Sequence, residues 1–575
     1  MAATATMEPA YRQATGKTRG GTGKWAGAAA VAGGTALIGG HAWLYGNWIV
    51  DDAAITFAYA RSISEGLGPV VAPGSEAVEG FSNPTWTLLL TVGRLLGLFD
   101  RGLLFGVPDY VLFPKLLGLL FCAGILVACH LAAKAVTRYA WLVTLAVGAV
   151  LSVIPSFVIW SFSGLENSLF AFLVTCLAVV LFRATLAGTL LTPKVAVWAG
   201  VLAALAALTR PDGMIYVGAY GILVLLRIRR NTVWPSVRNV LWSLAAFAVP
   251  YGLYVLWRFI EFGRLLPNTA VAKNQQLPEP EDLTRSSDLV GYIGAPFVLV
   301  VALVAGIALA RQSARRAALV APMVPLVLAA LTYSVLEPDW MEQLRFATPF
   351  WALAALTGAL VTTEALRDAR GRVLVLLALV VAGIPSLALS VGHAREFRGA
   401  PTIPTCYIAD RFGRVFNSYA DILELSEASV LEPDLGGSSL TSRLHIVDMA
   451  GLADSKIAEF YRGDRDMPGL RNYVYETVKP TFIHSRGPWG PGTGIARDPR
   501  LGTDYYPILR YGDEDLPVGD GDWVRKDAVL DQVHLDAVRA YAADTVPAID
   551  GRQLDWPLRS CGDVLRPGQT EVNLT

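Results

Sequence analysis

The chain has 575 residues, of which 53% are hydrophobic and 17% charged, with a mean hydropathy of +0.44 and a formal net charge of zero. Because soluble globular proteins carry about a quarter of charged residues, this composition excludes an ordinary soluble protein and indicates a membrane protein. The balanced charge and the lack of a basic tract also argue against a nucleic-acid partner.

Apolar stretches follow one another along the first two thirds of the chain. A transmembrane helix needs about 20 mostly apolar residues, and eleven stretches approach that length. We therefore expect a polytopic α-helical membrane domain over residues 26–392, after a cytoplasmic tail at 1–25. The predicted spans are 26–49, 110–133, 139–160, 166–187, 194–209, 212–228, 239–259, 289–310, 317–336, 345–364 and 372–392.

The loops between these stretches alternate in charge. Lys and Arg gather in the N-terminal tail and in every second loop, which the positive-inside rule assigns to the cytoplasm. The other loops are acidic, so we predict that they lie outside. An odd number of spans then places the C-terminal part on the exoplasmic side of the plasma membrane. The cytoplasmic basic groups are Arg12, Lys17, Arg19 and Lys24; Lys134 and Arg138; Arg183 and Lys194; Arg227, Arg229, Arg230 and Arg238; Arg311, Arg315 and Arg316; and Arg367, Arg370 and Arg372.

The chain changes character at about residue 393, beyond which no stretch could span a bilayer. Residues 393–575 are long enough for a soluble exoplasmic domain with its own core, which we expect to be α+β. Residues 445–452 predict a short strand and turn, and residues 530–543 a helix. Cys406 and Cys561 are the two cysteines of this part, and an oxidising exterior permits a disulfide without showing that the two meet.

Two adjacent carboxylates, Asp51 and Asp52, follow the first apolar stretch and open a long exterior loop at 51–109. Acids at a membrane surface are costly and are functional candidates by default. We expect an amphipathic helix at 53–65 with Arg61 toward water, and a second interfacial helix at 85–99 capped by Asn83. The alternative is a passive surface plug, which would not need Asp51, Asp52 and Glu79.

Four later exterior loops also carry polar groups at predicted helix ends. For Glu166 the structural alternative is a favourable helix-dipole interaction, and for Arg210 with Asp212 it is a snorkelling or paired arginine. For the loop of Asn268 and Lys273 it is a passive loop, and for Trp340 it is the interfacial aromatic belt. The candidates are Glu166; Arg210 and Asp212; Asn268 and Lys273; and Asp339, Trp340 and Arg345.

Acids and cations from five loops thus converge on one membrane face. Arginine forks match phosphate oxygens, and a carboxylate can take a proton from a hydroxyl. A sugar linked to a lipid phosphate fits this pattern, because its lipid lies in the bilayer and its sugar projects outward. The chain has no Walker loop, dinucleotide fingerprint or zinc-type spacing, which agrees with a membrane-borne donor.

The first exterior loop resembles that of GT-C glycosyltransferases. The resemblance rests on residues 51–61 (DDAAITFAYAR), 66–71 (GLGPVV) and 78–86 (VEGFSNPTW), and it extends to 209–213, 267–273, 339–346 and 447–454. Within that superfamily the chain is most similar to the terminal arabinofuranosyltransferases of actinobacterial cell-wall polysaccharide. Ala54 and Ala58 depart from the pattern, since relatives often carry Tyr and Arg there.

The resemblance implies transfer of a sugar from a polyprenyl-phosphate donor to an acceptor, with inversion and with a first-loop acid as general base. Asp51 is the first choice for that base and Asp52 the second. Arg210, Arg345 and either Lys273 or Arg61 would stabilise the leaving phosphate. No cofactor is certain; some relatives use a divalent cation, which Asp51, Asp52 and Glu79 could hold. The other residues expected to bind donor or substrate are Glu79, Asn83, Glu166, Asp212, Asn268, Asp339 and Trp340.

The sequence thus predicts an exoplasmic glycosyltransferase whose partners are a polyprenyl-phosphate sugar, a polysaccharide or glycolipid acceptor of the envelope, and the bilayer. The resemblance favours arabinofuranose as the sugar. For the C-terminal domain we expect acceptor binding, with a structural lid as the alternative. The rival functions are a lipid or sugar transporter, although the inverted repeats typical of transporters are not seen, and a non-catalytic envelope-assembly protein.

Overall fold

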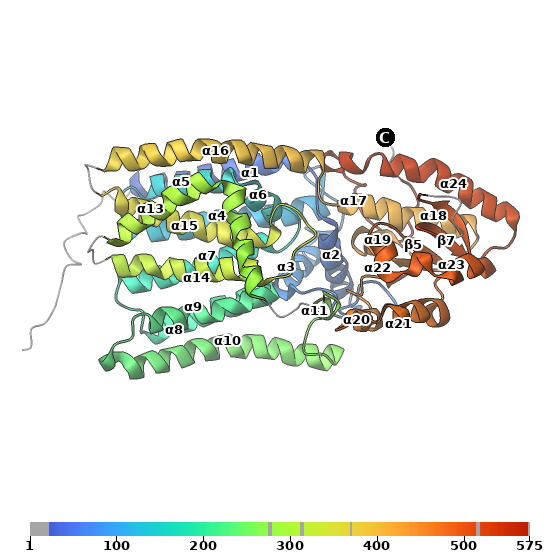
Figure 1. Ribbon diagram of the computed structural model, residues 1–575, viewed down its shortest axis with the longest axis horizontal. Coiled ribbons are helices and arrows are strands. Elements are labelled where there is room, and N and C mark those ends of the chain that lie inside the picture. The colour runs from blue at the N-terminus through green and yellow to red at the C-terminus, as the bar shows by residue number, and fades with distance from the viewer. Residues whose placement is uncertain (1–21, 274–278, 311–314, 368–370, 513–517, 573–575) are drawn as a thin grey trace, which may run out of the picture.

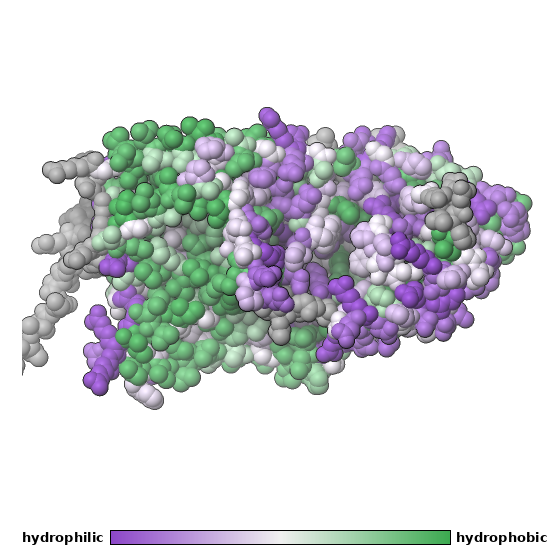
Figure 2. All heavy atoms as spheres, viewed as in Figure 1, coloured by the Kyte–Doolittle hydropathy of each residue, from purple (hydrophilic) through white to green (hydrophobic). Residues whose placement is uncertain are grey.

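The computed structural model describes residues 22–273, 279–310, 315–367, 371–512 and 518–572. A bundle of long helices forms one half of the molecule, and a mixed domain of short helices and a sheet covers one end of it (Figure 1). Hydrophobic side chains dominate the surface of the bundle, and hydrophilic side chains dominate the C-terminal domain (Figure 2). This division confirms the predicted fold class, a polytopic α-helical protein with a C-terminal α+β domain.

Six helices within the described residues are long and apolar enough to cross a membrane. Among them α7 is the most enclosed by its neighbours, whereas only 6% of the apolar window of α10 and of α16 is buried. An exposed apolar helix face is stable when lipid covers it. The six are α4 (Asp109–Lys134), α7 (Asn167–Leu186), η3 with α10 (Arg230–Thr232 and Val233–Phe262), α14 (Arg316–Val335), η5 with α15 (Arg345–Ala347 and Thr348–Ala365), and α16 (Arg372–Gly399).

The predicted count of eleven spans is not confirmed. Two stretches expected as single helices are bent pairs, which raises the count to at most eight. The first pair, α5 (Ala140–Ser152) and α6 (Pro155–Ser161), bends by 85° just before Pro155, since a residue that precedes proline avoids the helical conformation. The second bends by 104° at Gly294, whose φ of 100° favours glycine; its parts are η4 (Pro280–Arg285) with α12 (Ser286–Ile293), and α13 (Ala295–Ala310).

The remaining three predicted stretches form helices that are not among the six long apolar helices. α8 (Pro193–Thr209) and η2 with α9 (Pro211–Tyr216 and Val217–Leu225) are apolar but short. α1 (Thr22–Ala42) has 21 residues but is rich in glycine and alanine, and it leads through η1 (Trp43–Tyr45) into the first exterior loop.

The loop predicted at 51–109 is enclosed between the bundle and the C-terminal domain. It contains α2 (Asp51–Ser64), α3 (Pro84–Leu95) and a short antiparallel pair, β1 (Leu103–Leu104) and β2 (Val107–Pro108). Eleven of the 14 residues of α2 are buried, Arg61 among them. The expectation that α2 lies on the bilayer with Arg61 toward water is therefore wrong, because the C-terminal domain covers that face.

The C-terminal domain is built on a five-stranded sheet of order β4-β3-β5-β7-β6. β3 (Ser429–Glu432) pairs in parallel with β4 (His445–Asp448) and β5 (Phe482–Ser485), and β7 (Gly521–Arg525) is antiparallel to β5 and β6 (Tyr505–Arg510). The predicted strand at 445 and the predicted helix at 530 are both present. The helices are α17 (Thr405–Ile408), η6 (Ala409–Arg414), α18 (Val415–Ile422), α19 (Gly436–Thr441), α20 (Ser455–Tyr461), α21 (Met467–Asn472), η7 (Tyr473–Val478), α22 (Trp489–Thr493), η8 (Ile495–Arg497), α23 (Pro499–Asp504), η9 (Lys526–Ala528), α24 (Gln532–Asp550) and η10 (Gln553–Leu558).

The domain contacts the chain just before α2 through a backbone bridge and a side-chain hydrogen bond. Val50 forms an isolated antiparallel bridge with Pro404, and the Trp48 indole donates to the Thr402 carbonyl at 2.9 Å. A disulfide links Cys406 to Cys561, with the two Cα atoms 5.2 Å apart. The disulfide therefore links the N-terminal and C-terminal parts of the domain.

Candidate active site

The two adjacent aspartates of α2 point into different surroundings. Both carboxylate oxygens of Asp51 accept backbone N–H groups from the start of α19, Gly436 at 3.1 Å and Gly437 at 2.7 Å. The Asp52 side chain is 27% exposed and points toward the loop of the bundle that carries Arg345. Neighbours on a helix are rotated by about 100°, so one α2 turn serves two sites.

Burial raises the pKa of Asp51 well above its usual range, and repulsion from Asp434 adds to this effect. The two backbone N–H groups oppose the shift without cancelling it. Asp51 is therefore a closely packed contact between α2 and α19. A methyl group at Gly436 would lie 2.1 Å from the Asp51 carbonyl oxygen, so the contact needs glycine there.

Asp52 faces a cluster of charged groups from two other loops. Its carboxylate lies 3.9 Å from Arg345 Nη1, and Arg345 Nε lies 2.5 Å from Asp339 Oδ2. Burial raises the pKa of Asp52, while the positive charges of Arg345 and Lys273 pull it down. Asp52 is thus a carboxylate with a raised proton affinity that still contacts solvent, as a general base requires.

A second charged group lies beside the first. Arg210 donates to Glu166 at 3.1 Å and to Asp212 at 2.9 Å, and Asn83 donates to the other Glu166 oxygen at 2.7 Å. Asn83 stands at the N-cap position of α3, as predicted, but its side chain makes no cap hydrogen bond. It is instead used to hold Glu166.

The ring of Phe346 joins the two groups. The guanidinium carbons of Arg210 and Arg345 each lie 4.8 Å from its centroid, and Arg345 also lies 6.0 Å from the Trp160 ring. Such cation–π contacts help fix the direction of an arginine, and for Arg210 the ion pairs with Glu166 and Asp212 fix it further. Two oriented guanidiniums on one ring next to a carboxylate form a suitable site for a phosphate with a neighbouring hydroxyl.

Three other predicted residues have different surroundings. Glu79 is buried and bound by Arg258 Nε, by Arg258 Nη2 at 3.1 Å and by the Tyr254 hydroxyl at 2.5 Å. Arg61 forms a buried ion pair with Asp100 at 2.6 Å. Trp340 is 57% exposed.

Asn268 connects the bundle loop to the C-terminal domain. It opens α11 (Asn268–Lys273) and donates to the carbonyl groups of Gly451 at 2.8 Å and Leu452 at 3.0 Å. Lys273, at the other end of this short helix, is within the electrostatic field of Asp52. α11 thus holds Lys273 beside the cluster.

The expected metal ligands are separated by their partners. Asp51 is bound by α19 and Glu79 by Arg258, and within the described ranges no three or more His, Cys, Asp and Glu side chains form a group that could hold a metal ion. A divalent-cation requirement stays a prediction.

The sequence analysis missed Arg258, Asp434, Arg486 and Phe346. Arg258 lies inside the predicted span 239–259, and a charge within a span could have identified it. Asp434 is half-buried, interacts electrostatically with Asp52 and with Arg486, and has its pKa raised to about 6 by burial. Asp434 thus brings a charge of the C-terminal domain close to Asp52.

No protein-family model and no curated protein matches the chain. Solved structures do. ArnT from Cupriavidus metallidurans, bound to undecaprenyl phosphate, has a TM-score of 0.51 at 13% identity over 88% of this chain and 99% of that one. A variant of the arabinofuranosyltransferase AftD from Mycobacteria has a TM-score of 0.50 at 16% identity over 89% of this chain and 42% of that one.

The chain has the GT-C fold. The archaeal oligosaccharyltransferase AglB from Archaeoglobus fulgidus is a further match, with a TM-score of 0.45 at 12% identity, covering 80% of this chain and 69% of that one. In this fold, the charged cluster lies where the helical bundle meets the C-terminal domain.

Proposed function

We propose that the protein is a glycosyltransferase that moves a sugar from a polyprenyl phosphate to an acceptor of the cell envelope. The observation that carries this proposal is the position of Asp52, in a GT-C fold, 3.9 Å from Arg345 and on the same side as Arg210 and Lys273. A carboxylate beside fixed cations suits a reaction in which a hydroxyl loses a proton while a phosphate departs.

In the proposed step, an acceptor hydroxyl oxygen attacks the anomeric carbon from the face opposite the phosphate. The bond between that carbon and the phosphate oxygen breaks, the electron pair stays with the polyprenyl phosphate, and Asp52 takes the hydroxyl proton. Arg345 and Arg210 stabilise the charge of the leaving phosphate. Inversion at the anomeric carbon follows from this single displacement.

Asp52 is the base in this proposal, and Asp51 is its anchor. The Asp51 carboxylate is 5% exposed and already accepts two N–H groups, whereas Asp52 is partly open. Fastening Asp51 to α19 fixes the first turn of α2 and therefore the direction of Asp52.

The acceptor is proposed to enter from the side of the C-terminal domain. Asp434 interacts electrostatically with both Asp52 and Arg486, and carboxylate and guanidinium groups are suitable partners for sugar hydroxyls. Arabinofuranose is the proposed sugar, supported by the resemblance of the first loop and by the likeness to AftD in fold. The exoplasmic orientation of this face follows from the charge pattern of the loops.

The test is release of free polyprenyl phosphate by purified wild type, Asp52→Asn and Asp51→Asn. Each is supplied with a panel of polyprenyl-phosphate sugars and envelope polysaccharide, and rates are normalised to folded protein by size-exclusion chromatography. We expect turnover with one donor, a loss of about 10²–10⁴-fold in Asp52→Asn, and a smaller loss in Asp51→Asn. Full activity of Asp52→Asn would overturn the assignment of the base. Lipid movement without cleavage, or no turnover with any donor, would favour the transporter or the assembly protein.

A further inference from the structure

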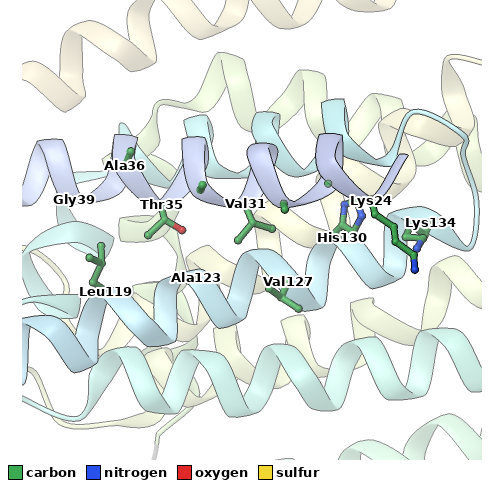
Figure 3. A pocket seen from close by; sticks show the side chains of 13 residues that line it. Lys24, Val31, Thr35, Ala36, Gly39, Leu119, Ala123, Val127, His130 and Lys134 are labelled. Carbon is green, nitrogen blue, oxygen red and sulfur yellow. The ribbon is translucent and has the colours of Figure 1, made fainter. Parts of the chain in front are cut away.

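An apolar groove runs between α1 and α4 (Figure 3). Its α1 wall is formed mostly by small residues, Gly27, Ala28, Ala32, Ala36 and Gly39, together with Val31 and Thr35. Both helices belong to the bundle, and the charged cluster at Asp52 shares none of the residues that line this groove. The groove is therefore separate from the candidate active site.

Three basic side chains close one end of the groove. Figure 3 places Lys24 of α1 beside His130 and Lys134 of α4, with Leu119 at the opposite end. Lys24 and Lys134 are exposed, and within the described residues neither is paired with a carboxylate. This end is the start of α1, away from the C-terminal domain (Figure 1).

His130 is fixed at this end by its neighbours. Its Nδ1 lies 2.9 Å from the Thr144 hydroxyl, and its Nε2 faces α1 so closely that a methyl group at Gly27 would lie 2.6 Å away. The two helices thus meet tightly near Gly27 while the groove stays open further along.

We propose that this groove binds one phospholipid with a negatively charged headgroup. From Lys24 to Gly39 it spans 15 helical residues, or about 22 Å, whereas one leaflet of hydrocarbon is about 15 Å thick. An acyl chain therefore fits along the small residues with its headgroup at the lysines. Basic pockets between transmembrane helices select anionic headgroups, each lysine adding to the attraction.

Small residues at a helix surface also serve helix–helix contacts, so a partner helix is the competing occupant. The lysines favour a lipid, because an apolar helix would leave two ammonium groups without a counter-charge, whereas an anionic headgroup supplies one. This inference does not depend on the proposed transferase activity.

The test is native mass spectrometry of delipidated full-length protein titrated with phosphatidylglycerol or phosphatidylcholine. We expect wild type to bind phosphatidylglycerol about tenfold more tightly, Lys24→Gln/Lys134→Gln to lose that preference, and Ala32→Leu/Ala36→Leu to bind neither lipid. Lys194→Gln and Leu37→Phe are the matched charge and volume controls and should bind as wild type. Size-exclusion profiles show that each variant is folded.

Equal affinity for the two lipids, or unchanged binding by the double lysine variant, would overturn the proposal. The proposal would also be overturned if Ala32→Leu/Ala36→Leu still bound lipid but formed smaller oligomers than wild type. A helix of a second copy would then be the occupant of the groove.

Discussion

The carboxylate of Asp51 accepts the backbone N–H of Gly437 at 2.7 Å, across 386 positions of the sequence. This hydrogen bond ties the first turn of α2 to the C-terminal domain directly beside the proposed catalytic Asp52. The domain is therefore part of what orients the base, and changes in this contact should affect folding more than chemistry.

Asp51→Ala should lower the stability of the protein. It leaves the two buried N–H groups of Gly436 and Gly437 without acceptors, which costs about 1–3 kcal/mol. Thermal unfolding of purified protein measures this as a fall in Tm. Asp52→Ala, on the adjacent and partly exposed residue, is the matched control and should melt close to wild type. A wild-type Tm for Asp51→Ala would contradict the anchoring role.

Arg345→Ala should reduce turnover, and Arg61→Ala should reduce stability. Removing one fixed donor to a developing charge typically costs about 10²–10³ in kcat. Arg61 lies in a different, buried network around Asp100. In Arg61→Ala, Asp100 would still be paired with Arg94 at 3.0 Å and with Arg566 at 3.2 Å. We therefore expect Arg61→Ala to lower the free energy of unfolding by about 2–3 kcal/mol. Donor turnover and Tm of the two variants distinguish the roles. Equal effects on turnover per folded molecule would place Arg61 in the reaction.

Glu79→Gln should destabilise the protein more than its single lost charge suggests. Arg258 would keep a buried charge without its counter-ion, at a cost of about 3–5 kcal/mol. The double variant Glu79→Gln/Arg258→Gln should recover much of that loss, because both charges are then absent. Unfolding midpoints of the three variants measure the coupling, with the exposed Glu281→Gln as the control. Additive losses in the double variant would show that the pair does not act as a unit.

The contribution of His484 to the stability of the C-terminal domain should fall as pH drops below about 6.5. His484 is fully buried with Nδ1 2.6 Å from Asp522, and burial lowers its pKa to about 4. A base whose folded pKa lies below its unfolded pKa of about 6.5 binds fewer protons when folded, so its stabilising contribution is present above pH 6.5 and is lost toward pH 4. From pH 7 to pH 5 the loss is about 2 kcal/mol.

The variant His484→Asn removes that titration while keeping a donor for Asp522. Its melting temperature at pH 7 should be lower, because the ring contact with Phe412 at 4.4 Å is lost, and the gap to wild type should narrow at pH 5, where wild type has lost the His484 contribution. A wild-type slope in this variant would show that other groups cause the pH dependence.

Reduction of the Cys406–Cys561 disulfide should lower Tm. The bond closes a segment of 155 residues, and such crosslinks contribute about 2–5 kcal/mol by restricting the unfolded chain. A thiol reductant and the double variant Cys406→Ser/Cys561→Ser should give the same lowered Tm. Reductant should have no further effect on the double variant, which serves as the control for the free cysteines of the bundle.

The sequence by itself determined the class of protein, the helical membrane domain followed by an α+β domain, and the resemblance to GT-C enzymes. It could do so because hydrophobicity, loop charge and short motifs are local properties, which nearby residues express without long-range contacts. The same locality explains why the strand at 445 was predicted, and why Arg210, Asp212, Glu166 and Arg345 were identified as site candidates.

The tertiary structure alone decided which aspartate is free and which is anchored. Asp51 and Asp52 are chemically alike and adjacent, so only the position of Gly436 and Gly437, hundreds of residues away, distinguishes them. Glu79 and Arg61 had the composition of site residues, but Arg258 and Asp100 neutralise them in place. A charged side chain takes its role from the partner that folding brings to it, and a linear pattern does not encode that pairing.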